Sequence, residues 1–189
     1  MHTSTGPKGQ NTAVARQYDS WARVYDCLWR RYMNQTLPVA QQVAAVEPGE
    51  QALDLACGTG ELLRLIAAAT PEAELTGVDL SPAMLERVHG KLPVEADVQI
   101  RQADAHNLPF ADDRFDVIVC ANTFHYFTHP RTVLTEVRRV LRPPGRFVVL
   151  DWCRDYWTCR AMDAVLRVVD QAYETCYTLD DLTGHLDAT

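Results

Sequence analysis

The stretch Leu53-Asp54-Leu55-Ala56-Cys57-Gly58-Thr59-Gly60 decides the fold of this chain. A short apolar run enters a turn with two glycines, and a helical pattern begins directly after it, with Leu62, Leu65, Ile66 and Ala69 on one stripe. Glycine allows the backbone to approach a ligand closely and to adopt positive φ angles. The stretch therefore predicts a buried strand, a ligand-binding loop and a helix, in that order.

Strands and helices alternate along the rest of the chain. Apolar runs predict strands at 51–56, 75–79, 98–101, 115–121 and 146–152, and helices are expected at 61–69, after Ser81-Pro82, at 130–141 and at 156–174. Thr178 and Asp181 have the spacing of a capping box for a last helix. The run at 115–121 is apolar almost throughout, as a central parallel strand is. The alternation predicts an α/β fold with a doubly wound, mostly parallel sheet.

The N-terminal part of the chain lacks this alternation of strands and helices. Residues 12–46 predict one or two helices, and their aromatic side chains follow helical spacing: Tyr18, Trp21, Tyr25, Trp29 and Tyr32. Glu47-Pro48-Gly49 then breaks the chain. We therefore expect a disordered polar leader over 1–11, without the apolar core of a signal peptide, a helical flap over 12–47, and the ligand-binding α/β domain over 48–189.

The composition indicates one globular domain in a reducing compartment. The chain has 189 residues, of which 47% are hydrophobic and 23% charged, and its net charge of −7 disfavours binding to nucleic acid. No apolar run is long enough to span a membrane. The six cysteines form no CxxC pair, so we expect scattered reduced thiols, no metal site and a cytoplasmic location.

An acidic residue follows the glycine loop at the spacing of a nucleoside site. Asp79 lies nineteen residues after Gly60, where a carboxylate can hold a ribose diol; its alternative role is to cap the helix after Ser81. A dinucleotide loop would carry a third glycine, but Leu63 stands there, and Glu61 would repel a pyrophosphate. S-adenosylmethionine has no phosphate and fits this loop. A nicotinamide-dependent reductase is disfavoured because no Tyr-x-x-x-Lys pair occurs.

Five segments together resemble the class I S-adenosylmethionine-dependent methyltransferases, near their ubiquinone/menaquinone-biosynthesis branch. They are similar to that family's motif I, motif II, adenine-binding segment, fourth strand and turn before the fifth strand, at residues 53–60, 78–81, 102–110, 115–119 and 141–146. The resemblance is close from Gln51 to Trp152. It implies a Rossmann-like sheet with strand order 3-2-1-4-5. It also implies two final strands, which the sequence does not show before Thr189, so the fifth strand would be an exposed edge.

The resemblance also implies a set of cofactor contacts. Asp54 would orient the methionine-binding loop, and Asp79 would accept both ribose hydroxyls. Asp104 would accept from the adenine amino group, and the backbone N–H of Ala105 would meet a ring nitrogen. The other expected cofactor-binding residues lie in the loop, in motif II, after the fourth strand and in the flap: Ala56, Gly58, Thr59, Gly60, Leu80, Ala121 and Tyr25. Before the fifth strand, Pro144 and Gly145 would make a type II turn in which only the glycine needs a positive φ.

Methyl transfer from a sulfonium is an in-line displacement that depends mainly on proximity and alignment. His125 follows the fourth strand and is the candidate general base, although packing explains its presence equally well. Asp151 and Trp152, at the end of the fifth strand, are candidate acceptor contacts.

The expected partner is a small-molecule or lipophilic acceptor that takes the methyl group on O, N or C. The chain has no Asn/Asp-Pro-Pro-Tyr run after the fourth strand and no Pro-Cys pair, which disfavours nucleobase acceptors. A second copy of the chain, in a homodimer, is a further candidate partner. The alternative function is a non-catalytic protein that keeps the S-adenosylmethionine pocket as a sensor or scaffold.

Overall fold

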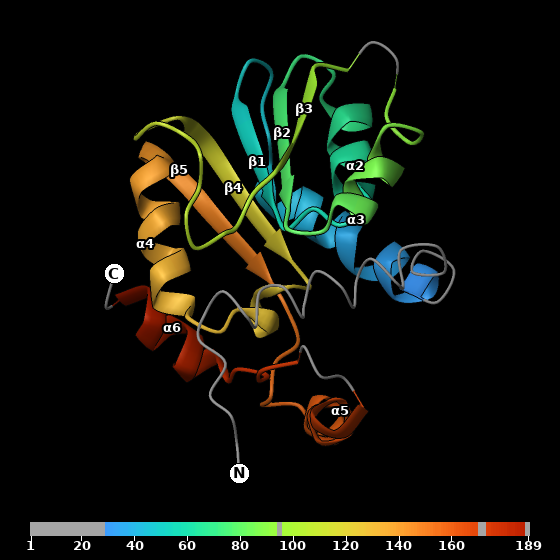
Figure 1. The fold of residues 1–189 in the computed structure, drawn as a ribbon, viewed down its shortest axis with the longest axis vertical. Coiled ribbons are helices and arrows are strands. Elements are labelled where there is room, and N and C mark those ends of the chain that lie inside the picture. The colour runs from blue at the N-terminus through green and yellow to red at the C-terminus, as the bar shows by residue number, and fades with distance from the viewer. Residues whose placement is uncertain (1–28, 94–95, 170–172, 188–189) are drawn as a thin grey trace.

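The computed structural model describes residues 29–93, 96–169 and 173–187. Within them lies one sheet of five strands: β1 (Gln51–Leu55), β2 (Glu74–Asp79), β3 (Val98–Gln102), β4 (Phe115–Ala121) and β5 (Leu141–Leu150). The strand order is β3-β2-β1-β4-β5, and every neighbouring pair is parallel. The predicted doubly wound α/β fold and its strand order are confirmed, with β5 at one edge of the sheet (Figure 1).

Helices cover both faces of this sheet (Figure 1). A helix over 29–44, α2 (Glu61–Ala69) and α3 (Pro82–Val88) pack on one face. The short helix η1 (Phe124–Tyr126), α4 (Pro130–Val140) and α6 (Leu179–Asp187) pack on the other. The remaining helix, α5 (Trp157–Val169), lies beyond the C-terminal end of β5.

Successive residues of the central strands enter two separate cores. In β1, Ala52 belongs to the core beneath α2 and α3, and Leu53 belongs to the core beneath α4. In β4, Val117 and Ile118 divide between the two cores in the same way. Side chains alternate between the faces of a strand, so a strand covered by helices on both sides is apolar at nearly every position. This explains the continuous apolar run that β4 shows in the sequence.

Two predicted helix starts are present. Ser81 Oγ accepts a hydrogen bond from Met84 N at 3.2 Å and caps α3. At α6, Thr178 N donates to Asp181 Oδ2 and Asp181 N donates to Thr178 Oγ1, both at 3.0 Å. These reciprocal bonds are a capping box, as the spacing of the two residues predicts.

The start of β5 differs from the prediction. The strand begins at Leu141 rather than at Arg146, and Gly145 has no positive φ, so the predicted type II turn is wrong. The strand pairing gives the reason: Phe115 faces Leu141 but Val117 faces Arg146, so β5 carries extra residues in a bulge. A Cβ on Gly145 would lie 2.7 Å from a backbone carbonyl oxygen of β4. Glycine is needed here because two backbones approach closely.

The described residues cover only part of the predicted flap. The helix over 29–44 belongs to it, whereas Tyr25 lies outside the described residues. In the described ranges, no helix combines the length and the apolar content that crossing a bilayer requires. The same ranges contain no group of three or more His, Cys, Asp or Glu side chains placed to hold a metal ion.

Candidate functional site

A pocket opens at the C-terminal ends of the strands, beneath the helix over 29–44. The glycine loop, the ends of β2 and β4, the segment after β3 and Trp152 form its walls, and the helix contributes Trp29, Tyr32, Met33 and Leu37. Doubly wound sheets bind their ligands at this edge, where loops from separate strands meet. Of the predicted site residues within the described ranges, all except Gly60 line this pocket: Asp54, Ala56, Gly58, Thr59, Asp79, Leu80, Asp104, Ala105, Ala121 and His125.

The glycine loop turns on three left-handed residues. Ala56, Gly58 and Gly60 have φ angles of 61°, 54° and 80°. A Cβ on Gly58 would meet nothing within 4 Å, whereas a Cβ on Gly60 would lie 2.6 Å from Val88 Cγ1. Gly58 therefore leaves its side of the loop open to a ligand, and Gly60 allows α2 to pack closely against α3. The structure gives Gly60 a packing role, which its place in the motif did not reveal.

Asp79 joins the glycine loop to the start of α3. Its Oδ2 accepts a hydrogen bond from Gly58 N at 2.8 Å, and its Oδ1 accepts one from Ser81 N at 2.9 Å. The same carboxylate lines the pocket beside Leu80. A carboxylate oxygen has two lone pairs, so each can hold a backbone N–H and still accept from a ligand hydroxyl. The two roles considered for Asp79 are therefore compatible.

Asp54 is a buried carboxyl with an unmet hydrogen-bonding requirement. The residue is 4% exposed, and Oδ2 has no hydrogen-bond partner among the described residues. Burial, and then the charge of Asp79, raise the pKa of Asp54 to about 8. A buried carboxylate without a partner is costly, and a cation or N–H donor in the pocket would relieve that cost. The site is thus prepared for a positively charged group.

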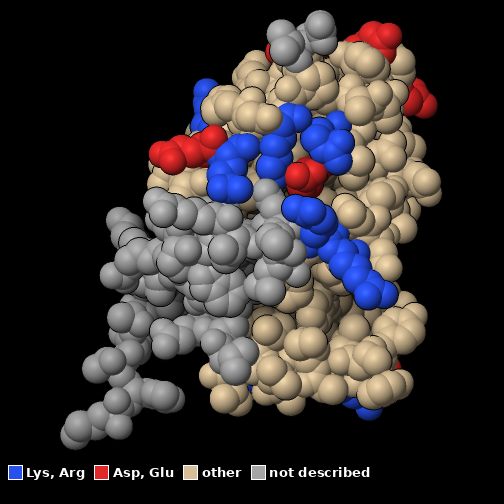
Figure 2. Space-filling model, turned by 90° about the vertical axis from the view of Figure 1, so that its right-hand side faces the viewer, with Lys and Arg blue, Asp and Glu red and all other residues tan. Residues whose placement is uncertain are grey.

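Glu61 lines the pocket at the first turn of α2, and two basic side chains that do not line the pocket balance its negative charge. Its carboxylate is paired with Arg64 Nε and Lys91 Nζ, both at 2.9 Å. Burial acts to raise the pKa of Glu61, but the hydrogen bonds from Lys91 and Arg64 outweigh it and lower the pKa. Figure 2 shows Lys and Arg side chains gathered on this face of the molecule, on the side of α2 and α3.

The pocket itself is acidic. Four acidic side chains are among its described lining residues, which include no Lys or Arg: Asp54, Glu61, Asp79 and Asp104. Such a lining attracts a cation and repels a pyrophosphate, which needs positive charge or several N–H donors. The geometry therefore supports the sequence argument against a dinucleotide.

A histidine that the sequence did not single out lies beside the predicted adenine contact. Asp104 and Ala105 line the pocket after β3, as does His106. Asp104 Oδ1 accepts from His106 N at 2.9 Å and meets His106 Nδ1 at 2.7 Å. The sequence does not distinguish this pair from any two polar residues that lie two positions apart in a loop.

His125 and Asp151 form a second pair at the other end of the pocket. His125 Nδ1 lies 2.6 Å from Asp151 Oδ1, and His125 N donates to Asp151 Oδ2 at 2.9 Å. His125 lies on η1 and Asp151 directly follows β5, and their side chains are 6% and 10% exposed. A carboxylate can only accept, so Nδ1 donates to Asp151, and in a neutral ring Nε2 carries the lone pair. The predicted base and the end of the fifth strand are thus brought into direct contact.

An aromatic wall closes this end of the pocket. Tyr32 OH donates to Asn122 Oδ1 at 2.9 Å, and Asn122 Nδ2 donates to Thr36 Oγ1 at 3.2 Å. The Tyr32 and Trp29 rings meet the Trp152 ring edge-on, with centroids 5.7 and 6.4 Å from it. The helical aromatic spacing indicated such a face, but Asn122 as its anchor at the end of β4 was missed.

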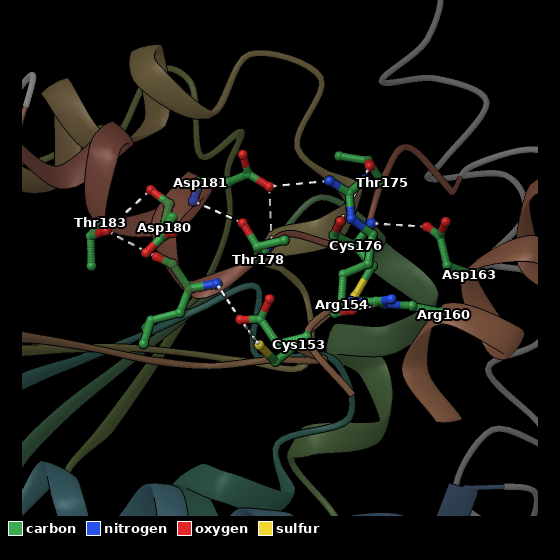
Figure 3. A network of polar contacts seen from close by, with 12 residues as sticks. Cys153, Arg154, Arg160, Asp163, Thr175, Cys176, Thr178, Asp180, Asp181 and Thr183 are labelled. Atoms are coloured by element: carbon green, nitrogen blue, oxygen red, sulfur yellow. Dashed lines mark hydrogen bonds and ion pairs between the residues drawn. The ribbon is translucent and has the colours of Figure 1, made fainter. Parts of the chain in front are cut away.

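Polar contacts fix the chain that follows this wall (Figure 3). Asp163, buried on α5, accepts from Cys176 N at 3.1 Å, and Cys176 Sγ donates to Trp152 O at 3.0 Å. Thr175 N donates in turn to His125 O at 3.2 Å. The segment after α5 therefore holds both His125 and Trp152 in position.

The fold and the acidic, glycine-lined pocket define a Rossmann-like nucleoside-binding domain. A family model described as "Methyltransferase domain" matches residues 53–149. The chain belongs to this family of methyltransferase domains.

Two curated relatives are similar over about three quarters of the chain. The demethylmenaquinone methyltransferase of Thermotoga maritima is 40% identical over 142 residues, which are 73% of this chain and 58% of that protein. The ubiquinone/menaquinone biosynthesis C-methyltransferase UbiE of Ectopseudomonas mendocina is 36% identical over 150 residues, 75% of this chain and 56% of that protein. The chain thus spans less than two thirds of the length of these relatives.

The fold is also similar to solved structures. A chain from the complex between the Haloferax volcanii Trm112 methyltransferase activator and a methyltransferase superposes with a TM-score of 0.79. It is 22% identical, and the match covers 90% of this chain and 74% of that one. At this identity the likeness demonstrates the shared fold.

Proposed function

We propose that this chain binds S-adenosylmethionine in the pocket and transfers its methyl group to a small-molecule acceptor. The observation that carries the proposal is the unpartnered, buried Oδ2 of Asp54, in a pocket whose described lining residues include no Lys or Arg. S-adenosylmethionine bears a sulfonium, an ammonium and a carboxylate group and no phosphate, so its net charge is positive and complements this lining. The family of the chain supports the same cofactor.

Three walls of the pocket would each contact a different part of the cofactor: its methionine, its ribose and its adenine. Asp54 would meet the methionine ammonium, beside the loop residues Ala56, Gly58 and Thr59 and the carbonyl of Ala121. That carbonyl also accepts from Thr123 Oγ1 at 3.2 Å and has a second lone pair. Asp79 would hold the ribose diol next to Leu80, and Asp104 with Ala105 would meet the adenine.

The acceptor would lie against His125 and the aromatic wall. When bound, S-adenosylmethionine supplies an activated methyl group on its sulfonium. His125 Nε2 is the basic nitrogen and would take the proton that an acceptor oxygen, nitrogen or carbon must lose. Asp151 holds the ring in that tautomer at 2.6 Å and would stabilise the imidazolium that forms. The walls of the pocket would hold the two ligands in the alignment that in-line transfer requires.

We infer a flat, lipophilic acceptor rather than a charged one. Trp29, Tyr32, Tyr126 and Trp152 line this end of the pocket. Aromatic rings stack on aromatic walls and gain from the loss of water. The two relatives named above are demethylmenaquinone and ubiquinone/menaquinone methyltransferases, which supports the same class. The absence of nucleic-acid binding, a cytoplasmic location and a homodimer remain predictions.

Calorimetry and a transfer assay test this function. The chain should bind S-adenosylhomocysteine at micromolar concentrations and should bind NAD far more weakly; tighter binding of NAD would overturn the cofactor. The chain should then move labelled methyl groups from S-adenosylmethionine into a lipid-soluble fraction of a cell extract. Asp79→Ala serves as the control with weakened cofactor binding. Tight binding without transfer to any fraction would instead indicate a sensor or scaffold.

A further inference from the structure

The Asp–His pair after β3 contains a histidine that the proposed reaction does not use. Asp104 Oδ1 accepts hydrogen bonds from both the backbone N and the ring Nδ1 of His106, at 2.9 and 2.7 Å. The carbonyl oxygen of Asp104 accepts from Asn107 N at 2.9 Å, which closes the turn on the same residue. Together these bonds set the direction in which the Asp104 carboxylate stands at the pocket wall.

The hydrogen-bond chemistry of the pair follows from this arrangement. Because a carboxylate only accepts, the hydrogen of the contact lies on His106 Nδ1. Nε2 is buried and has no hydrogen-bond partner among the described residues. The rings of Phe127 and His129 meet the His106 ring edge-on, with centroids at 6.0 and 6.1 Å, and so restrict its rotation. The Asp104 carboxylate, held by these bonds, is therefore a hydrogen-bond acceptor at this wall of the pocket.

We propose that His106 is a positioning residue that makes the pocket select a 6-amino purine over a 6-oxo purine. An exocyclic amino group donates hydrogen bonds, whereas a keto oxygen accepts them. A keto oxygen set against Asp104 would leave two acceptors facing each other, both removed from water, which is costly. His106 acts through Asp104, because its ring holds the carboxylate in the orientation that meets the amino group. This role depends on the adenosyl ligand assigned above under the proposed function.

Two ligands that differ only at the purine 6-position test this role, and the test does not require the methyl acceptor to be known. Calorimetry would measure the dissociation constants of S-adenosylhomocysteine and S-inosylhomocysteine for the wild-type chain, His106→Ala and His106→Asn. Asparagine places an amide N–H near the position of Nδ1 and keeps a donor for Asp104, whereas alanine removes it. His89, exposed at the end of α3, provides the matched control His89→Ala. The ratio of the two constants does not depend on the fraction of each variant that is folded.

The wild-type chain should bind S-adenosylhomocysteine about 10- to 100-fold more tightly than its inosyl analogue. In His106→Ala this ratio should fall by about three-fold or more. It should stay within about two-fold of the wild-type ratio in His106→Asn and His89→Ala. An unchanged ratio in His106→Ala, or equal affinities in the wild-type chain, would overturn the role of His106 and leave the proposed function intact. No binding of S-adenosylhomocysteine to the wild-type chain would overturn both.

Discussion

Asp54→Asn should change how the stability of the unliganded chain depends on pH. Burial and the charge of Asp79 raise the pKa of Asp54 to about 8 in the folded chain, against an ordinary value of 3.8. Between these two values the folded state keeps the proton and the unfolded state loses it. Unfolding therefore releases a proton, and the stability of the wild-type chain falls as the pH rises through this range. Asparagine cannot ionise, so its variant lacks this contribution.

The expected magnitude follows from the gap between the two pKa values. Each pH unit in that range removes about 1.4 kcal/mol, so the penalty from Asp54 reaches roughly 4 kcal/mol at neutral pH. A buried amide without partners costs about 1–3 kcal/mol in the variant. Asp54→Asn should thus be more stable than the wild-type chain at neutral pH by on the order of 1–3 kcal/mol.

Urea unfolding across the range from mildly acid to mildly alkaline pH measures this difference. Asp97→Asn, at an exposed aspartate, is the matched control and should follow the wild-type pH dependence. If Asp54→Asn also followed it, Asp54 would ionise in the folded chain as a surface carboxyl does, and the case for a cationic ligand would fall. The ammonium group that S-adenosylhomocysteine shares with S-adenosylmethionine can form an ion pair with Asp54 only when Asp54 is ionised. Binding of S-adenosylhomocysteine should therefore release close to one proton from the wild-type chain at neutral pH and none from Asp54→Asn, as calorimetry in two buffers can show.

Three further substitutions separate ligand contacts from packing. Asp79→Ala should weaken S-adenosylhomocysteine binding roughly ten- to a hundred-fold in calorimetry, because charge-assisted hydrogen bonds to the ribose are lost; an unchanged constant in a folded variant would leave Asp79 only its bonds to the loop and α3. His125→Gln should keep that affinity within about two-fold and lower methyl transfer by about 10²–10⁴-fold, whereas full activity would leave alignment alone as the source of catalysis. Gly60→Ala should lower the free energy of unfolding by about 1–3 kcal/mol, since the new Cβ would lie 2.6 Å from Val88 Cγ1. Adding Val88→Ala should recover part of this loss in urea unfolding, and equal stability of Gly60→Ala and the wild-type chain would show that the loop can shift.

Signals confined to neighbouring residues were sufficient to predict most of the fold. The apolar run of β4 and the Thr178–Asp181 capping box depend on contacts within a strand or a helical turn, so their pattern is visible in the sequence. The bulge before β5 was missed because it depends on which residues of β4 lie opposite, and pairing between distant strands leaves no local pattern.

The candidate site shows the same division. That Asp54, Gly58 and Asp79 line one pocket could be predicted because they follow motif spacing along consecutive strands. The contact of His125 with Asp151 joins residues 26 positions apart, and the bond from Tyr32 to Asn122 joins residues 90 positions apart. Only the folded sheet brings such residues together. The residue type of His125 therefore suggested a role as a base, but the sequence did not identify Asp151 as its hydrogen-bond partner.

The bond between Tyr32 and Asn122 bears on how the specificity of this domain could be altered. The wall that we propose for the acceptor comes from the helix over 29–44, the residues after β4 and the residues after β5. The charged contacts that we propose for the cofactor come instead from Asp54, Asp79 and Asp104. The side-chain amide of Asn122 connects this helix to the end of β4, because it is hydrogen-bonded to the hydroxyl groups of Tyr32 and Thr36. Exchange of that helix, with Asn122 and its hydroxyl partners retained, would offer a different surface to the acceptor. On the proposed function, cofactor binding and acceptor choice would therefore diverge independently, by substitutions in separate segments of the chain.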